Sequence, residues 1–299
     1  ILVRDLGALY RAALTGEPDG LPTLTADFVD ISRWERDHLA AESTRRMVRD
    51  WAEQVRPYAV PVRLPTDRPR AEAVSAAGAT LTETVPSELV DVVGGYAAHR
   101  NVTPFVVYAA AFAALVHELT GAPGVMLTVP VANRTDPRFA EVVGVFTHSP
   151  WLAVELAGVR SFDELVDRTA AATWQLLALQ SVPLPMLNEA LGEPFTGNPP
   201  RVFLAMLDLA DPVLALPGVE PAPARDVPMP GARADQTWYL RPLPGGGLSL
   251  VAEYATALFD PGTVHRLADR WQQLLRQALT DPAAWPPPAP EAAPAQPGD

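Results

Sequence analysis

The chain has 299 residues, 48% of them hydrophobic and 19% charged, a composition that can bury one large core or two lobes. Its formal net charge of −12 excludes a nucleic-acid partner, because no basic stripe could neutralise phosphates. The absence of cysteine excludes disulfides, a thiolate nucleophile and cysteine-ligated metal, and it fits a cytoplasmic location.

The first third of the chain is predicted to be helical. Leu2, Leu6 and Leu9 recur at helical spacing and predict a helix over 1–14. Residues 28–55 read as one long amphipathic helix. The segment 64–70 contains two prolines and breaks regular structure, so we place a boundary near it.

Strands and helices interleave after this boundary. We expect strands over 79–85, 125–131, 202–207 and 248–254, and helices over 87–99, 103–119, 162–179 and 260–279. The longest apolar run, at 105–116, is shorter than the roughly 18 residues of a membrane span. No membrane partner is therefore expected, and the fold class is predicted to be α/β or mixed α+β.

Generic catalytic signatures are missing from the sequence. Gly245, Gly246 and Gly247 precede a predicted strand and read as a hairpin turn, not as a phosphate loop. No two of the five histidines have a metal-binding spacing, so no metal site is expected. His38, His99 and His265 lie in polar stretches and are predicted to be solvated, whereas His117 is predicted to satisfy a backbone group.

His148 differs from the other histidines in its surroundings. It lies in a polar cluster with Thr147 and Ser149, between apolar segments, and such a cluster indicates a bend that lines a cavity. General-base catalysis by His148 is a second reading, which needs a positioned partner that the sequence does not guarantee.

Several segments, taken in order, resemble the condensation domains of nonribosomal peptide synthetases. They are Phe28-Val29-Asp30-Ile31-Ser32-Arg33-Trp34, Leu64-Pro65-Thr66-Asp67-Arg68-Pro69-Arg70, Val102-Thr103-Pro104-Phe105, Val129-Pro130-Val131-Ala132-Asn133-Arg134, Val143-Gly144-Val145-Phe146 and Glu253-Tyr254-Ala255-Thr256. No single motif decides the resemblance, but their order and spacing together do.

The resemblance implies a two-lobed fold of the chloramphenicol-acetyltransferase type around a tunnel, with most of this chain in the C-terminal lobe. Residues 1–63 would form the end of the N-terminal lobe and the interlobe helices. Residues 64–280 would form the C-terminal acyltransferase-like lobe, with a crossover loop near 208–234 that packs on the N-terminal lobe. Residues 281–299, rich in proline and alanine, would be a linker.

The resemblance also implies a reaction and its partners. Condensation domains join thioesters that peptidyl carrier proteins deliver on phosphopantetheine arms, so the arm would come from the partner and no cofactor would be bound covalently here. The family's His-His-x-x-x-Asp-Gly motif is absent from these residues, so no catalytic residue is expected in this chain. The N-terminal lobe that holds the motif would be a further partner.

Site residues are carried over position by position. Thr147, His148 and Ser149 stand in place of the family's Val-Asn-Thr and would line the tunnel, while Asp235 would face the tunnel or cap a turn. Structural roles follow for four residues on matching motif positions, namely Asp30, Trp34, Asn133 and Arg134.

Departures from the family pattern raise an alternative function. Besides Thr147-His148-Ser149, the family's His-Gln-Asp-Val-Pro is reduced to Leu179-Gln180-Ser181-Val182-Pro183. A retained scaffold with a changed site fits a domain that has lost its reaction. Non-condensing X domains of glycopeptide synthetases, which recruit haem monooxygenases to a carrier-bound peptide, are therefore the alternative to an active condensation domain.

Overall fold

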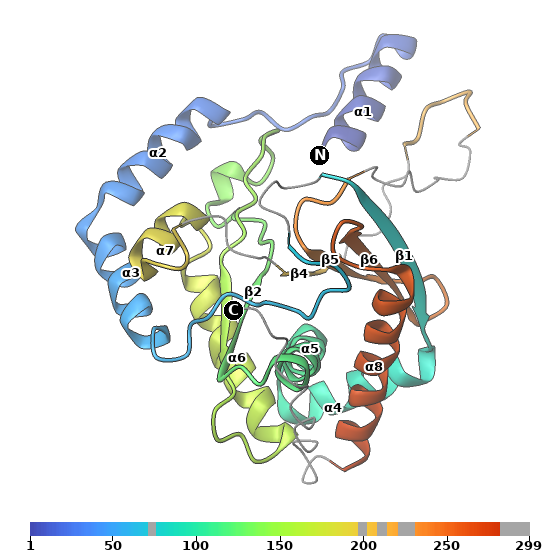
Figure 1. The fold of residues 1–299 in the computed structure, drawn as a ribbon. Helices are drawn as coiled ribbons and strands as arrows, with labels where there is room; N and C mark the ends of the chain where they lie inside the picture. The colour runs from blue at the N-terminus through green and yellow to red at the C-terminus, as the bar shows by residue number, and fades with distance from the viewer. Residues whose placement is uncertain (71–75, 197–201, 208–213, 221–230, 282–299) are drawn as a thin grey trace.

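Six short strands assemble into one mixed sheet in the order β1-β6-β5-β4-β2-β3 (Figure 1). The computed structural model describes residues 1–70, 76–196, 202–207, 214–220 and 231–281. The strands are β1 (Gly78–Val85), β2 (Gly124–Thr128), β3 (Trp151–Glu155), β4 (Val202–Met206), β5 (Gln236–Pro242) and β6 (Leu248–Ala255). Strands β2, β4 and β5 run parallel, and the other neighbours are antiparallel. The predicted mixed α/β class is confirmed.

The helices of the described residues flank this sheet or extend from it. They are α1 (Leu2–Thr15), α2 (Phe28–Ala40), α3 (Glu42–Val55), α4 (Ser87–Arg100), α5 (Pro104–Thr120), α6 (Phe162–Ala178), α7 (Leu184–Leu191) and α8 (Pro261–Thr280), with a short 3₁₀ turn at Pro137–Phe139. Proline at the first turn begins α5 and α8, because its missing N–H has no helical partner there.

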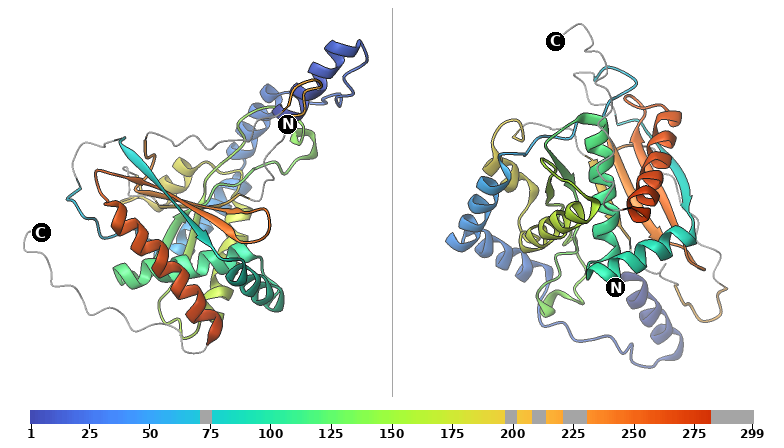
Figure 2. Two further views of the ribbon diagram at one scale, coloured as in Figure 1. Left: turned by 90° about the vertical axis from the view of Figure 1, so that its right-hand side faces the viewer. Right: turned by 90° about the horizontal axis from the view of Figure 1, so that it is seen from below.

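The main core lies between one face of the sheet and four helices, α4, α5, α6 and α8 (Figure 2). Helix α5 is buried along its whole middle, from Val106 to Val116, which explains why its sequence is apolar on every face. At its centre the ring of Phe112 meets the edge of Trp238 on β5, with ring centroids 4.9 Å apart.

Helices α3 and α7 cover only one end of the other face of the sheet. Their apolar side chains cluster with Met126 on β2 and with Trp151 and Ala153 on β3. The indole N–H of Trp151 donates to the Asn188 side chain on α7 at 2.8 Å. Over β1 this face exposes Thr80, Thr82 and Thr84, and their partners on β6, Ser249, Val251 and Glu253, are half-buried. The β1 edge of the second face therefore remains accessible.

The predicted single helix over 28–55 is wrong. Ala41 adopts an extended conformation (φ −65°, ψ 138°) and separates α2 from α3. The two helices pack against different partners: α2 contacts the loop around Phe139 and Phe146, and α3 contacts α7 and the β2–β3 end of the sheet. The break allows both apolar faces to be buried.

The strand predicted over 125–131 is also shorter in the structure. Regular pairing ends at Thr128, beyond which the Val129 N–H donates to the Pro150 carbonyl and an isolated bridge joins Val131 to His148. Pro150, opposite Val129, lacks the N–H that a continued ladder would need. The sequence reading missed β3, β5 and α7, each of which is at most eight residues long.

The turn between β5 and β6 is a hairpin at Gly245–247, as predicted. Of the predicted crossover loop, residues 208–213 and 221–230 lie outside the described residues, and so does nearly all of the predicted linker. Within the described part of the chain, no single helix combines the length and the hydropathy of a membrane span.

Candidate functional site

The loop that follows β2 packs against α2 through an aromatic cluster. Phe139, Val142 and Phe146 are buried with Ile31 of α2, and Trp34 packs on them. Phe28, at the start of α2, meets Phe146 at a ring-centroid distance of 5.7 Å. Gly144 permits this approach, since a Cβ there would lie 2.3 Å from the Phe28 ring.

Arg134 holds this loop in shape. Its guanidinium donates to the carbonyls of Phe139 at 2.5 Å and Val142 at 2.9 Å, and lies 3.9 Å from the centre of the Phe146 ring. The preceding Asn133 is buried and adopts a left-handed conformation (φ 49°), and its side-chain oxygen has no hydrogen-bond partner among the residues that the structure describes. These contacts are of the kind expected for a structural role.

Asp30 and Trp34 both lie on α2. The Asp30 carboxylate accepts from the backbone N–H of Asp27, and Asp27 in return caps the first turn, so the pair forms a capping box. Trp34 stacks on the imidazole of His38 at 5.1 Å, with the two rings nearly parallel, and meets the ring of Phe139 edge-on.

His148 joins the loop to α2 through a hydrogen-bond contact. Its Nε2 lies 2.6 Å from Oε1 of Glu35, and the two side chains are 20% and 32% exposed. Thr147 beside it is exposed and Ser149 is half-buried. The structure thus supplies the positioned partner that the sequence could not guarantee, while the cavity-lining role of these three residues stays a prediction.

A second polar contact joins α2 to the turn between α6 and α7. Nε2 of His38 lies 2.8 Å from the hydroxyl of Ser181, which is 8% exposed. The prediction that His38 is solvated is therefore wrong. The prediction for His117 is confirmed, because its Nδ1 lies 2.8 Å from the backbone carbonyl of Ala122.

The contact between Glu35 and His148 predicts a measurable coupling. Glu35→Gln and His148→Gln together should cost less stability than the sum of the single changes, by about 0.5–1.5 kcal/mol. The measurement is a double-mutant cycle of urea unfolding at neutral pH. The exposed Asp30–Arg33 pair, with side chains 51% and 66% exposed, is the control and should couple by about 0.5 kcal/mol or less. Strict additivity at Glu35 and His148 would show that the contact does not stabilise the loop.

Asp235 directly precedes β5 and pairs with the segment that precedes β1. The Arg70 guanidinium donates to both carboxylate oxygens of Asp235, at 3.0 and 2.5 Å. The Asp235 side chain is 11% exposed and that of Arg70 is 36% exposed. The sequence predicted that Asp235 faces the tunnel or caps a turn, and neither role included this bidentate pair. Next to it the side-chain N–H₂ of Gln236 is buried, without a hydrogen-bond partner in the described part of the chain.

The same segment is attached to the start of α8. The Asp67 carboxylate accepts from the backbone N–H of Asp260 and from the Thr263 hydroxyl, both at 2.7 Å. These two hydrogen bonds hold the pKa of Asp67 below its usual value. Arg68 forms an ion pair with the Asp260 side chain. Residues 67–70 therefore fix the approach of the chain to the sheet.

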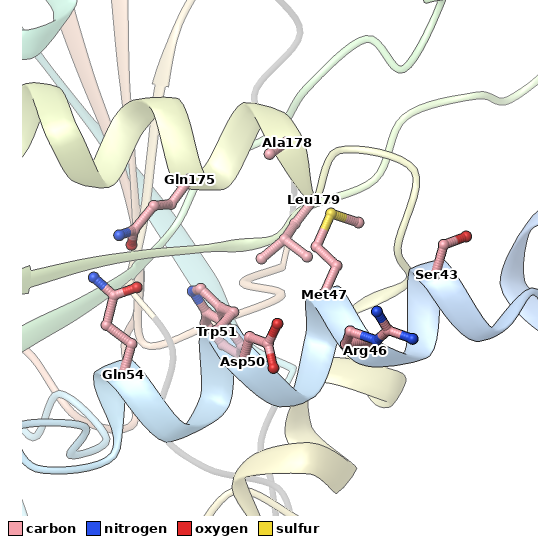
Figure 3. Close-up of a pocket in the computed structure, with 9 residues that line it drawn as sticks. All are labelled: Ser43, Arg46, Met47, Asp50, Trp51, Gln54, Gln175, Ala178 and Leu179. Carbon is pink, nitrogen blue, oxygen red and sulfur yellow. The ribbon is translucent and has the colours of Figure 1, made fainter.

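A groove of about 410 Å³ runs between α3 and α6 (Figure 3). Trp51, Met47 and Leu179 form its apolar part, and polar side chains of both helices stand around them. The groove contains none of the predicted site residues. Sequence periodicity could not find it, because its two walls are more than 100 residues apart in the chain.

Helix α1 exposes an apolar stripe. Leu2, Leu6, Leu9 and Leu14 are each at least 50% exposed, whereas only Ala8 of this helix is buried. A Cβ on Gly7 would lie 3.2 Å from the carbonyl oxygen of Ala215. The described segment 214–220 therefore lies next to α1. No cluster of metal-ligating side chains occurs in the described ranges.

Comparison with known proteins identifies the scaffold. The condensation-domain family matches residues 1–222. The phosphinothricin tripeptide synthetase PhsC of Streptomyces viridochromogenes is 33% identical over 286 residues, which are 94% of this chain and 26% of PhsC. The chain belongs to the condensation-domain family of nonribosomal peptide synthetases.

Solved structures show the same fold. A first condensation domain of the calcium-dependent antibiotic synthetase superposes with a TM-score of 0.73 at 23% identity, over 94% of this chain and 61% of that one. The X-domain in its complex with OxyB from teicoplanin biosynthesis gives 0.77 at 21% identity, over 94% and 64%. The condensation-family chain thus spans about a quarter of PhsC and under two thirds of these structures.

Two residues at positions where this condensation-family chain departs from the family motifs contact α2. His148 bonds Glu35 and Ser181 bonds His38. Neither pairing was anticipated, because α2 is more than 100 residues away in sequence. The only hint in the sequence was the polar character of Glu35 and His38 on an amphipathic helix.

Proposed function

We propose that this chain forms the C-terminal part of a condensation-type domain that joins carrier-bound aminoacyl or peptidyl thioesters into an amide. In this reaction the acceptor amine attacks the thioester carbonyl, a C–N bond forms, the C–S bond breaks and the thiol of the donor arm leaves. Peptidyl carrier protein domains would deliver both substrates on phosphopantetheine arms.

The observation that carries this proposal is the incomplete burial of α1 and of the second sheet face. Four leucines of α1 are at least half exposed, and β1 exposes Thr80, Thr82 and Thr84 on the face without a helix cluster. Large exposed apolar surfaces mark sites of association. A companion N-terminal lobe would cover both surfaces and complete a two-lobed domain.

The residues described here would then act as scaffold. Asp67 and Arg70 fix the segment between the two parts, and Arg134 shapes the loop that carries Thr147, His148 and Ser149. Attack on a thioester needs a neutral amine, proximity and a proton acceptor. The family's histidine motif, absent from these 299 residues, would supply the proton acceptor from the other lobe.

The test is turnover with and without the lobe that carries the motif. Residues 1–299 alone, given donor-loaded and acceptor-loaded carrier proteins, should form no peptide above the uncatalysed rate. The complete two-lobed domain should form it, and changing the second histidine of its motif to alanine should lower the rate by about 10²–10⁴-fold. Peptide formation by residues 1–299 alone, measured by mass spectrometry, would overturn the assignment of roles.

A second candidate is recruitment of a haem monooxygenase without condensation. It is favoured by His148 and Ser181, which replace family residues and are held in contacts with Glu35 and His38. Binding of the complete domain to carrier protein and to haem monooxygenases separates the two functions. Monooxygenase binding together with absence of turnover in the complete domain would select this candidate.

A further inference from the structure

Strand β1 has one edge that pairs with no other strand. It lies at one end of the strand order, on the outer rim of the sheet, and β6 pairs with its inner edge (Figure 1). The Thr256 N–H donates to the Ala77 carbonyl, so odd-numbered residues of β1 bond β6 and even-numbered ones point outward. The outward backbone groups of Thr80, Thr82 and Thr84 have no partner among the described residues.

This edge lacks the features by which proteins usually protect an exposed strand. Such edges are short, or they contain proline, lysine or a bulge. All eight residues of β1 have consecutive partners on β6, and none of them is proline, lysine or arginine. The only charged residue, Glu83, is turned toward α8, where its Oε1 lies 2.6 Å from Nδ1 of His265. The edge of β1 can therefore receive a further strand.

The free part of the edge has defined ends. Before it, Ala77 forms an isolated antiparallel bridge with Gly231, which shows that an antiparallel neighbour fits at this edge. After it, Pro86 has no N–H to donate. Residues 79–85 remain free, and Thr82 is the middle one.

The side chains of this free edge are symmetric about the same residue. Beside an antiparallel second copy with the two Thr82 residues opposite each other, Thr80 would face Thr84 of the second copy. Threonine pairs of this kind stabilise neighbouring strands. Glu83 would face Leu81, so no two like charges would be opposite each other. A strand from another protein does not require this symmetry, whereas a two-fold pair does.

We propose that two copies of this chain pair edge to edge through β1, antiparallel about a two-fold axis at Thr82. The outward N–H and carbonyl groups of Thr80, Thr82 and Thr84 exchange hydrogen bonds with those of the second copy, and the two sheets become one. The new strand lies in the plane of the sheet, whereas the companion lobe of the proposed function covers its face. The pairing does not depend on turnover, so it can stand if the condensation activity fails.

The dimer is expected to be weak. One pair of strands buries less surface than the roughly 1,600 Å² of a standard interface, which places its Kd in the micromolar range or above. The net charge of −12 on these 299 residues also opposes self-association, and salt screens this repulsion.

Sedimentation velocity of the complete two-lobed domain tests the proposal. At about 0.15 M salt the sedimentation coefficient should rise with protein concentration between about 1 and 100 µM, as a monomer–dimer equilibrium requires. Thr82→Pro removes an outward N–H that does not bond β6, so it should keep the fold and raise the dimer Kd about tenfold or more. Thr82→Val, the matched control, keeps this N–H and should change the Kd less than about threefold.

Introduced cysteines test the register independently. Residues 1–299 contain no cysteine, and any cysteine of the companion lobe is changed to serine first. Thr82→Cys should give a disulfide-linked dimer on oxidation, because the Cα atoms of opposite residues lie about 5.5 Å apart. Thr84→Cys should not, because the two thiols would be separated by four residues along the strand, about 13 Å.

Three results would overturn the proposal. The first is a complete domain that stays monomeric up to about 100 µM, which would mean that the companion lobe or another segment covers the edge. The second is an equal Kd for Thr82→Pro and Thr82→Val. The third is an equal disulfide yield from Thr82→Cys and Thr84→Cys, and this comparison decides if Thr82→Pro lowers the melting temperature by more than about 4 °C.

Discussion

Phe112→Ala is expected to lower the free energy of unfolding by about 3–5 kcal/mol. Phe112 is 1% exposed, lies at the centre of α5 and packs edge-on against Trp238 of β5. Its removal would leave a cavity between the helix layer and the sheet, which close-packed neighbours cannot fill. Equilibrium unfolding in urea measures the loss.

Trp174→Ala is the matched control for this prediction. It also removes a large aromatic side chain from a helix, but one that is 74% exposed, so the expected change is within about 0.5 kcal/mol. A loss below about 1 kcal/mol for Phe112→Ala would mean that the layer around α5 is not closely packed.

Arg70→Ala is expected to cost about 3 kcal/mol of stability, since it leaves the carboxylate of Asp235 without its partner. The Asp235 side chain is 11% exposed and accepts two hydrogen bonds from the guanidinium. Water can reach the Arg70 side chain, which is 36% exposed. The loss of stability should therefore lie at the lower end of the range for broken buried ion pairs. Thermal and urea unfolding both report it.

Two further variants show whether bidentate pairing is the cause. Arg70→Lys keeps the charge but loses the planar guanidinium that donates to both carboxylate oxygens, so it should recover only part of the stability. Arg49→Ala removes an arginine whose side chain is 56% exposed and paired with Glu42, which is 63% exposed, and should cost about 0.5 kcal/mol or less. Equal losses of stability for Arg49→Ala and Arg70→Ala would contradict the conclusion that the Arg70–Asp235 pair stabilises the fold.

Local sequence patterns predicted most of the helices and the family. The apolar run at 105–116 required a helix buried on all sides, and the prolines at 104 and 261 marked the starts of α5 and α8. The ordered motifs around Asp67, Arg134 and Tyr254 indicated a condensation domain, which the family match confirmed. These features depend on residues close together in the chain, so a linear pattern contains them.

The folded structure alone shows how distant side chains meet. The predicted single helix is divided at Ala41, because α2 and α3 bury their apolar faces against different neighbours. The fold placed Glu35 on His148, His38 on Ser181 and Arg70 on Asp235, pairs separated by 113, 143 and 165 residues. It also formed the groove between α3 and α6. Periodicity determines which face of an element is apolar, but the element that covers this face is chosen by packing of the whole chain.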